Sequence, residues 1–212
     1  MCLAIFISSF FFGCVPTLDT KIKSDLNANG IEAKSFSGLL MHEPAKVETK
    51  SGTYYKVYTP FWKAFSNGGP PRKPLPPAGS IGFCTKSVES VSIDELNLLP
   101  QNPDWSTGIK AEWEPGEKGA SARLQSFLDD ALASYSEGRD IPGKLLTSKL
   151  SPHLRFGEIS PNQIWDATRG IENKTPHSSL ETYRKELVWR EFAYHLLFHN
   201  PDLHEREFQE KF

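Results

Sequence analysis

Cysteine is scarce in this sequence of 212 residues, and its three cysteines, Cys2, Cys14 and Cys84, are scattered without metal-ligand spacing. An odd number of unclustered cysteines argues against a disulfide framework and against a structural zinc site. A reducing, intracellular compartment is therefore expected, with cytoplasm, nucleus and organelle left open. His195 and His199 lie one helical turn apart, as metal-binding histidines can, but no third ligand has suitable spacing, so no metal site is predicted.

The chain also lacks an excess of charge of either sign. It has 24 Lys and Arg residues against 26 Asp and Glu residues, a net charge of −2. The sequence as a whole therefore carries no electrostatic footprint for nucleic acid, and any DNA binding would have to rest on local geometry. Nucleophile-elbow, Walker A and Rossmann glycine motifs are absent as well. Conventional hydrolytic or phosphoryl-transfer chemistry is thus unsupported, and no catalytic side chain is predicted.

Long hydrophobic runs are missing too. Residues 1–16 contain an apolar run, Leu3–Ile7 followed by Phe10–Phe12, that is shorter than the roughly 18–20 residues needed to span a bilayer. The run also lacks the basic start and the cleavage site of a secretory signal. No membrane association is expected. The segment is either a buried strand or an aberrant N-terminus, and we favour residues 1–18 as a stretch that does not belong to the fold.

The segment that follows resembles the end of an α/β unit. Residues 19–29 are polar and compatible with a helix, and Gly30 is placed to end it. Residues 31–36 alternate like a half-buried strand. The aromatic cluster at 54–65 is expected to dock this unit onto another part of the protein. Helix, glycine and strand in this order predict an α/β remnant over residues 19–65.

The composition then changes twice. Residues 66–119 are rich in proline and glycine, which predicts an extended interdomain connector, and Trp105 and Trp113 are expected to anchor it. From residue 120 the apolar residues recur at helical spacing. The fold class predicted is an α/β remnant followed by a mainly α-helical domain over residues 120–212. The expected core face of its first helix consists of Leu124, Phe127, Leu128, Ala131 and Tyr135.

The stretch Thr147–Pro161 is dense in hydroxyl side chains and contains two Ser-Pro pairs. Ser at the N-cap followed by Pro predicts helix starts after Ser151 and after Ser160. Unpaired N–H groups at a helix start, together with neighbouring hydroxyls, can hold a phosphate. The alternative is that these residues only cap helices. A longer helix is expected at 179–199, with Ser178 and Glu181 as its capping box.

On this last helix, Glu186, Trp189 and Arg190 share one face because they are three and four residues apart. A flat stacking surface beside a hydrogen-bond acceptor and a fixed cation suits an extruded nucleobase. The same three residues would also suit a structural role, with the indole in the core and an ion pair at its rim. The residues alone leave both interpretations open.

Four motifs, in order along the chain, resemble the DNA photolyase/cryptochrome family, and its class I cyclobutane pyrimidine dimer photolyases most. Thr147–Ser160 resembles the family's flavin-binding signature, and Glu186–Phe192 resembles its helix at the lesion pocket. Trp113–Glu117 resembles the start of its helical domain, and Tyr58–Lys63 resembles the end of its antenna-binding α/β domain. The resemblance implies a flavoprotein, a monomer, that uses blue light and FAD to repair pyrimidine dimers in DNA.

The resemblance also implies roles for individual residues. The flavin contacts implied are Tyr135, Thr147, Ser148, Lys149, Leu150, Ser151 and Tyr183. The DNA contacts implied are Arg139, Glu186, Trp189 and Arg190. Lys149 stands where many relatives have Arg, which keeps the charge but loses the forked geometry of the guanidinium. Leu18 also departs from the family, which usually has Arg there.

Family members are about twice as long as this chain, which resembles a fragment truncated at both ends. The site of the antenna chromophore, of folate or deazaflavin type, is therefore expected to be largely absent. We expect this polypeptide alone to bind FAD weakly or not at all and not to repair DNA. Two alternatives remain: a cryptochrome photoreceptor, in which the same pocket signals, and an inactive helical fragment without cofactor.

Overall fold

The computed structural model of the chain describes residues 15–34, 38–83, 85, 89–203 and 205–208, and every regular element in these residues is helical. The α-helices are α1 (Val15–Ala28), α2 (Tyr58–Asn67), α3 (Thr107–Glu112), α4 (Glu117–Ser126), α5 (Tyr135–Gly138), α6 (Ser151–Phe156), α7 (Pro161–Arg169) and α8 (His177–His199). The shorter helical turns are η1 (Pro44–Lys46), η2 (Asp94–Leu96), η3 (Phe127–Ala131) and η4 (Leu132–Ser134).

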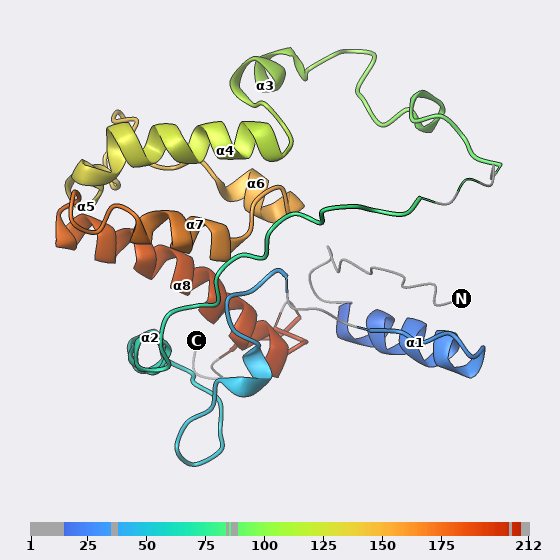
Figure 1. Cartoon of the computed structure of the whole chain (residues 1–212), viewed down its shortest axis with the longest axis horizontal. Helices are drawn as coiled ribbons and strands as arrows, with labels where there is room; N and C mark the ends of the chain where they lie inside the picture. Colours follow the sequence, from blue (N-terminus) through green and yellow to red (C-terminus); the bar gives the residue numbers. More distant parts are fainter. Residues whose placement is uncertain (1–14, 35–37, 84, 86–88, 204, 209–212) are drawn as a thin grey trace.

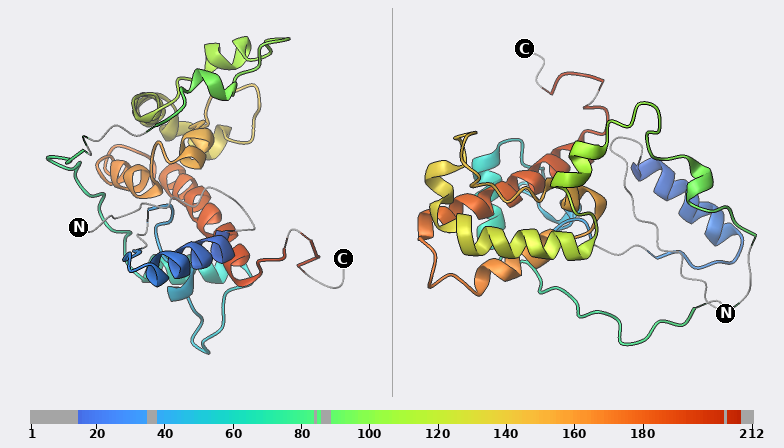
Figure 2. Two further views of the ribbon diagram at one scale, coloured as in Figure 1. Left: turned by 90° about the vertical axis from the view of Figure 1, so that its right-hand side faces the viewer. Right: turned by 90° about the horizontal axis from the view of Figure 1, so that it is seen from above.

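Helix α8 is the centre of the helical body. It packs against α5, η4 and α7 from the second half of the chain, and against η1 and α2 from the first half. Figure 1 shows α4, α5 and α7 above α8, and α2 with η1 below it, whereas α1 stands to one side. The right-hand view of Figure 2 also shows α1 to one side of the α4–α8 bundle. The long helix therefore brings together segments that are far apart in the sequence.

One cluster of buried apolar side chains stabilises this body. It draws on the segment before α2, on α2 itself and on the helices from α4 to α8. Its larger members are Met41, Phe61, Phe65, Leu124, Phe127, Leu132, Tyr135, Leu150, Leu154, Ile164, Trp165, Leu180, Tyr183, Leu187, Val188 and Phe192. Because fully burying each such side chain contributes about 1.5–3 kcal/mol, this shared core is the main attachment of α2 to α8.

The N-terminal expectations are met only in part. A helix is present, and Gly30 follows it with φ of 71°, a backbone conformation that glycine adopts without strain. The predicted strand at 31–36 is wrong where it can be judged: residues 31–34 form no strand, and residues 35–37 lie outside the described residues. No other strand occurs in the described chain to pair with it, and an unpaired strand leaves its backbone groups without partners.

In the predicted connector, the described residues from 69 to 93 form no helix or strand, whereas its second part contains η2, α3 and the start of α4. Its expected anchors behave differently from each other. Trp105 is 67% exposed and does not anchor the connector, so that expectation is wrong. Trp113 packs near His153, with ring centroids 6.2 Å apart, and the Arg123 guanidinium lies 4.8 Å from its ring centroid. The connector is therefore attached through Trp113, immediately before α4.

The first helix of the second half is interrupted. Leu124, Phe127, Ala131 and Tyr135 are buried as predicted, whereas Leu128 is only partly buried. After α4 the backbone widens into the π-helical turn η3 and then tightens into the 3₁₀ turn η4 before α5 begins. Such turns within a helix shift which side chains face the core. Here they place Tyr135 at the first residue of α5.

The three predicted helix starts have different outcomes. Ser160 caps α7, with its hydroxyl accepting from Gln163 N and the Gln163 side chain accepting from Ser160 N. Helix α6 instead begins at Ser151 with Leu150 as its N-cap, so Ser151 lies inside the helix and does not cap it. The capping box at Ser178 is also wrong, because α8 begins at His177, one turn before Glu181.

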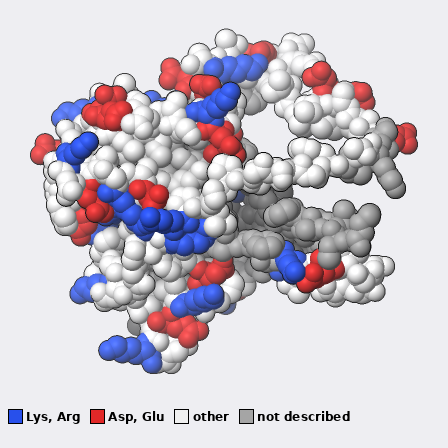
Figure 3. Space-filling model, viewed as in Figure 1, with Lys and Arg blue, Asp and Glu red and all other residues white. Residues whose placement is uncertain are grey.

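Within the part of the chain that the structure describes, no helix combines the length and apolar character needed to cross a membrane. Among the same residues, no group of three or more His, Cys, Asp and Glu side chains could hold a metal ion. Figure 3 shows acidic and basic side chains interspersed over the helical body.

Candidate functional site

An ion pair between Arg139 and Glu186 links α5 to the middle of α8. The Arg139 side chain, directly after α5, donates from Nη1 to Glu186 Oε1. Its guanidinium also lies 5.6 Å from the ring centroid of Tyr135. The hydrogen bond to Glu186 is the main cause that raises the pKa of Arg139 above its ordinary value. Two residues predicted separately as DNA contacts are therefore in direct contact with each other.

Trp189 lies on α8 three residues beyond Glu186, with 45% of its surface exposed. Tyr58, the first residue of α2, stacks on one face of the indole: the ring centroids are 3.5 Å apart and the planes differ by 9°. Phe192 packs against Trp189 edge to face at 5.9 Å. The indole is thus held between α2 and α8 while retaining a large exposed surface.

Two tyrosines predicted as flavin contacts are in contact with each other in the core. Tyr135 and Tyr183 are 6% and 3% exposed, and their rings meet edge to face at 5.2 Å. Burial raises the pKa of Tyr183 above its ordinary value, although the Ser148 side chain acts in the lowering direction. The Tyr183 hydroxyl therefore stays neutral near pH 7 and can donate.

The rest of that segment faces solvent or the core in alternation. Thr147, Lys149 and Ser151 are exposed, Ser148 is half-buried, and Leu150 is 1% exposed within the core. Lys149 has φ of 50°, an uncommon value for a residue other than glycine. No side chain caps the start of α6. The segment therefore presents two hydroxyls and one ammonium outward, beside a helix start without a side-chain cap.

Arg190 does not join the Arg139–Glu186 pair. Its Nη1 donates to Leu39 O at 3.0 Å and lies 3.3 Å from Glu191 Oε1. Arg190 therefore attaches the segment before α2 to α8, although it is adjacent in sequence to Trp189.

Glu191 is a residue that the sequence interpretation missed. It is 3% exposed, and its Oε2 accepts from Met41 N at 2.8 Å and from His42 N at 3.3 Å. Burial, acting against the attraction of Arg190, raises its pKa to about 7. Nothing in its sequence neighbourhood indicates this role, because its partners lie about 150 residues earlier.

Tyr58 is the second missed residue. It lies inside a motif that the sequence interpretation used for docking, but its contact with Trp189 depends on how α2 crosses α8. An aromatic residue at the start of a helix that carries other aromatic residues is the only sequence signal for it. That signal indicates packing and does not identify the partner.

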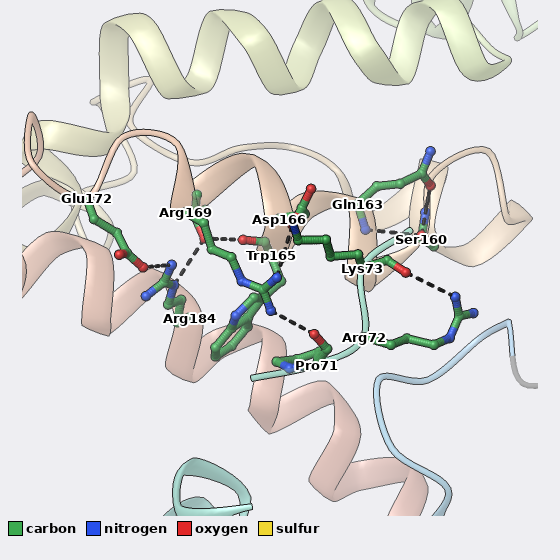
Figure 4. Close-up of polar contacts among 11 residues, drawn as sticks. Pro71, Arg72, Lys73, Ser160, Gln163, Trp165, Asp166, Arg169, Glu172 and Arg184 are labelled. Carbon is green, nitrogen blue, oxygen red and sulfur yellow. Dashed lines mark hydrogen bonds and ion pairs between the residues drawn. The ribbon is translucent and has the colours of Figure 1, made fainter. Parts of the chain in front are cut away.

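A separate pocket of about 720 Å³ lies between α2, α7 and α8, with Trp62, Phe65 and Trp165 among its lining residues. Arg184 lies 4.9 Å from the ring centroid of Trp165 and pairs with Glu172 at 2.6 Å. Figure 4 shows this network beside the crossing connector. None of the residues predicted to bind flavin or DNA lines the pocket, which is therefore distinct from the candidate site.

Another basic residue that lines this pocket, Arg169, is hydrogen-bonded to the connector. Arg169, at the end of α7, donates from Nη2 to Pro71 O at 2.7 Å and pairs through Nη1 with Asp166 at 3.1 Å. Acidic or carbonyl partners therefore already occupy both guanidinium groups at this pocket.

Comparison with known proteins identifies the chain's relatives. The family model described as DNA photolyase matches residues 16–78. A deoxyribodipyrimidine photo-lyase of Agrobacterium fabrum is 45% identical over 194 residues, which are 92% of this chain and 40% of that protein. Cryptochrome-1 of Arabidopsis thaliana is 29% identical over 197 residues, 89% of this chain and 29% of that protein.

Solved structures agree on the fold. The crystal structure of a bacterial class III photolyase from Agrobacterium tumefaciens matches with a TM-score of 0.88 at 44% identity, over 92% of this chain and 41% of that one. A Synechocystis cryptochrome shares the fold with a TM-score of 0.57 at 22% identity, over 86% of this chain and 39% of that one.

The expected similarity to class I photolyases is not matched in detail, because this Agrobacterium tumefaciens structure is of class III. The chain spans about two fifths of the length of the first curated photo-lyases it matches. Its mainly helical fold and its similarity to photolyases along nine tenths of its length show that the chain belongs to the DNA photolyase/cryptochrome family.

Proposed function

We propose that this chain carries the lesion-stacking surface and one side of the flavin site of an FAD-dependent photolyase that repairs cyclobutane pyrimidine dimers in light. The observation that supports this most is the grouping of Trp189 with the Arg139–Glu186 pair on one side of α8. Its relatives named photo-lyase agree with this proposal.

The grouping has the chemistry that an extruded pyrimidine dimer requires. A base taken out of the duplex loses its stacking neighbours, and an aromatic side chain replaces part of that stacking. Trp189 provides such a surface, since nearly half of it is exposed. Glu186 provides a carboxylate acceptor for the base edge, and Arg139 provides donors for a phosphate or a carbonyl. No net basic charge is needed for this local recognition.

The hydroxyl-rich segment has groups that would suit the phosphates of a flavin dinucleotide. Thr147, Lys149 and Ser151 are exposed and lie at or directly before the start of α6, which no side chain caps. N–H groups and hydroxyls in such a position can hold phosphate oxygens. Ser148 is half-buried between these exposed residues, and Leu150 is buried. We propose that the Ser148 hydroxyl also faces the flavin and that Leu150 contributes through its backbone.

When bound and reduced, the flavin would supply the excited-state electron that starts the opening of the cyclobutane ring. The contribution of this chain is to bind and orient. The buried Tyr135–Tyr183 pair lies beside the Arg139 guanidinium, which pairs with Glu186. We propose that these residues hold cofactor and lesion close together while limiting the access of water.

The proposal is tested by the affinity of the chain for an oligonucleotide that carries one thymine dimer, measured by fluorescence anisotropy. Because base stacking on an aromatic side chain contributes about 1–3 kcal/mol, Trp189→Ala should weaken dimer binding about tenfold or more. Trp105→Ala, which removes an exposed tryptophan that is not among the predicted site residues, is the matched control and should leave the affinity unchanged. Equal affinity for damaged and undamaged strands would refute the proposal.

Repair itself is tested in a hybrid protein. The matching segment of the Agrobacterium fabrum photo-lyase is exchanged for the sequence of this chain. The loss of thymine dimers from DNA under blue light is then measured. Retained repair that Trp189→Ala abolishes would support the proposal. A hybrid that retains flavin but neither binds nor repairs dimers would favour a cryptochrome function, which the similarity to Cryptochrome-1 raises. Loss of flavin as well would favour the inactive helical fragment.

A further inference from the structure

Tyr58 occupies one of the two faces of the Trp189 indole. The two ring centroids are 3.5 Å apart and the planes are within 9° of parallel, so the tyrosine ring covers that face. Neither the family comparison nor the sequence motif assigns a role to this contact. It joins the start of α2 to the part of α8 where the proposed lesion surface lies.

Tyr58 is itself fixed by its surroundings. Its hydroxyl donates to Lys185 O at 2.9 Å, and its ring meets Phe192 edge to face at 5.8 Å. Burial raises the pKa of Tyr58 above its ordinary value, which keeps the hydroxyl protonated and able to donate. A ring bonded at one end and packed at its edge has few alternative rotamers. It is therefore a rigid support for the indole.

The other ring contact of Trp189 leaves part of the indole exposed. Phe192 lies against the indole edge to face, at a centroid distance of 5.9 Å, and 45% of the residue is still exposed. Because Tyr58 covers one face, a planar base that stacks on the indole has to use the opposite face, and intercalation between two rings is blocked by the tyrosine.

We propose that Tyr58 is a positioning residue that holds the Trp189 indole in one orientation, so that a single base of an extruded dimer stacks on its open face. This inference rests on the proposed lesion-binding function of Trp189. The physical gain is preorganisation, because an indole already fixed loses little rotational freedom when the base binds. Tyr58 itself contacts no DNA in this arrangement.

A purely structural role for Tyr58 predicts different behaviour, and the chain offers a matched control for it. Tyr54, from the same segment, also stacks on a ring of α8: its ring is 4.5 Å from that of His199, at 8°. Its hydroxyl donates to Asn200 Oδ1 at 3.1 Å. Tyr54→Leu therefore removes a comparable anchor between this segment and α8 without touching Trp189.

The first measurement needs no DNA. The indole Nε1–H signal of Trp189 is assigned in the NMR spectrum of the 212-residue chain by its loss in Trp189→Phe. Removal of the stacked ring in Tyr58→Leu or Tyr58→Met should shift and broaden this signal, whereas Tyr58→Phe and Tyr54→Leu should leave it in place. Two non-aromatic replacements are used so that a folding defect in one does not decide the result. An unshifted signal in both would overturn the inference.

The second measurement is the dissociation constant for the thymine-dimer oligonucleotide. Tyr58→Leu should raise it about three- to tenfold, a substantial part of the effect of Trp189→Ala, because the stack of indole on base is worth about 1–3 kcal/mol. Tyr58→Phe should stay within about twofold of the wild type, and so should Tyr54→Leu.

The two failures are distinguishable. If Trp189→Ala weakens dimer binding but Tyr58→Leu does not, the positioning role is overturned and the lesion site stands. If Trp189→Ala has no effect on dimer binding, the proposed lesion-binding function of Trp189 is refuted, and the positioning role of Tyr58 is refuted with it. If Tyr54→Leu weakens binding as much as Tyr58→Leu, the effect reflects general docking of α2 and the positioning role is overturned.

Discussion

At the scale of single residues, Glu191 illustrates how a buried carboxylate ties two distant segments together. With 3% of its surface exposed, it accepts hydrogen bonds from two consecutive backbone N–H groups, at Met41 and His42, and pairs with Arg190. Burial still prevails over these partners and raises its pKa to about 7. The carboxyl group is therefore protonated more readily in the folded chain than in the unfolded one.

This raised pKa predicts a pH-dependent stability. A group whose pKa is higher in the folded state contributes stability that is present below its ordinary value, here 4.5, and is lost as pH rises through about 7. Glu191→Gln keeps an acceptor oxygen and cannot ionise. We expect the free energy of unfolding of the wild type to fall relative to this variant by about 1–3 kcal/mol across that interval. Urea denaturation at a series of pH values measures it.

His195 makes the comparison with the variant necessary. Burial lowers its pKa from 6.5 to about 4, so it contributes stability above its ordinary value that is lost as pH falls from 6.5 through 4. Over part of the interval the two residues act in opposite directions. The wild-type curve alone could appear flat, whereas the difference between wild type and Glu191→Gln isolates the glutamate. A constant difference across the interval would contradict the assignment to Glu191.

At the scale of elements, helix starts show which sequence signals are sufficient. Ser160 caps α7 as predicted because its backbone is extended, with φ of −93° and ψ of 153°, and because Gln163 completes the capping box. At the other Ser-Pro pair the positive φ of Lys149 turns the chain early, and Leu150 already has helical angles. Ser151 is thereby drawn inside the helix. The same dipeptide gives two outcomes because the preceding backbone differs.

The two capping predictions can be compared by mutation. Ser160→Ala removes a cap that is present and should lower the free energy of unfolding by about 1 kcal/mol. Ser178→Ala, at the predicted cap that α8 does not use, should change it by less than about 0.5 kcal/mol, as an exposed substitution away from special features does. Thermal or urea unfolding of both variants checks this. Equal losses would mean that the observed N-cap does not determine the stability of α7.

At the scale of the whole molecule, sequence patterns predicted the helical second half, the stretch without helices before residue 94 and the docking of the aromatic segment. They did not predict where the docked segment lies, because amphipathic spacing identifies an apolar face but not its partner. The lesion candidates Glu186 and Trp189 follow from helical spacing. Their partners Arg139 and Tyr58 come from other elements, and the orientation of Arg190 depends on a carbonyl of residue 39.

The division into a segment at 19–65 and a helical part at 120–212 stays a prediction, and the core offers a way to test it. Phe61, on α2, is 2% exposed and belongs to the same buried cluster as the helices from α4 to α8. Its ring lies 5.2 Å from that of Phe192 and 5.1 Å from that of His195. A shared core of this kind should make α2 and α8 unfold together.

Phe61→Ala tests this cooperativity. Truncation of a buried phenylalanine costs about 3–5 kcal/mol, so the variant should unfold at a much lower urea concentration, with helical circular dichroism and tryptophan fluorescence changing together. Leu75→Ala, in the connector and 80% exposed, is the control and should unfold like the wild type. If Phe61→Ala instead lowered only a separate, early transition and left the main helical transition in place, α2 would be an independent unit. The lesion surface would then lose the Tyr58 stack before the helical body unfolds, because Tyr58 belongs to the same helix as Phe61.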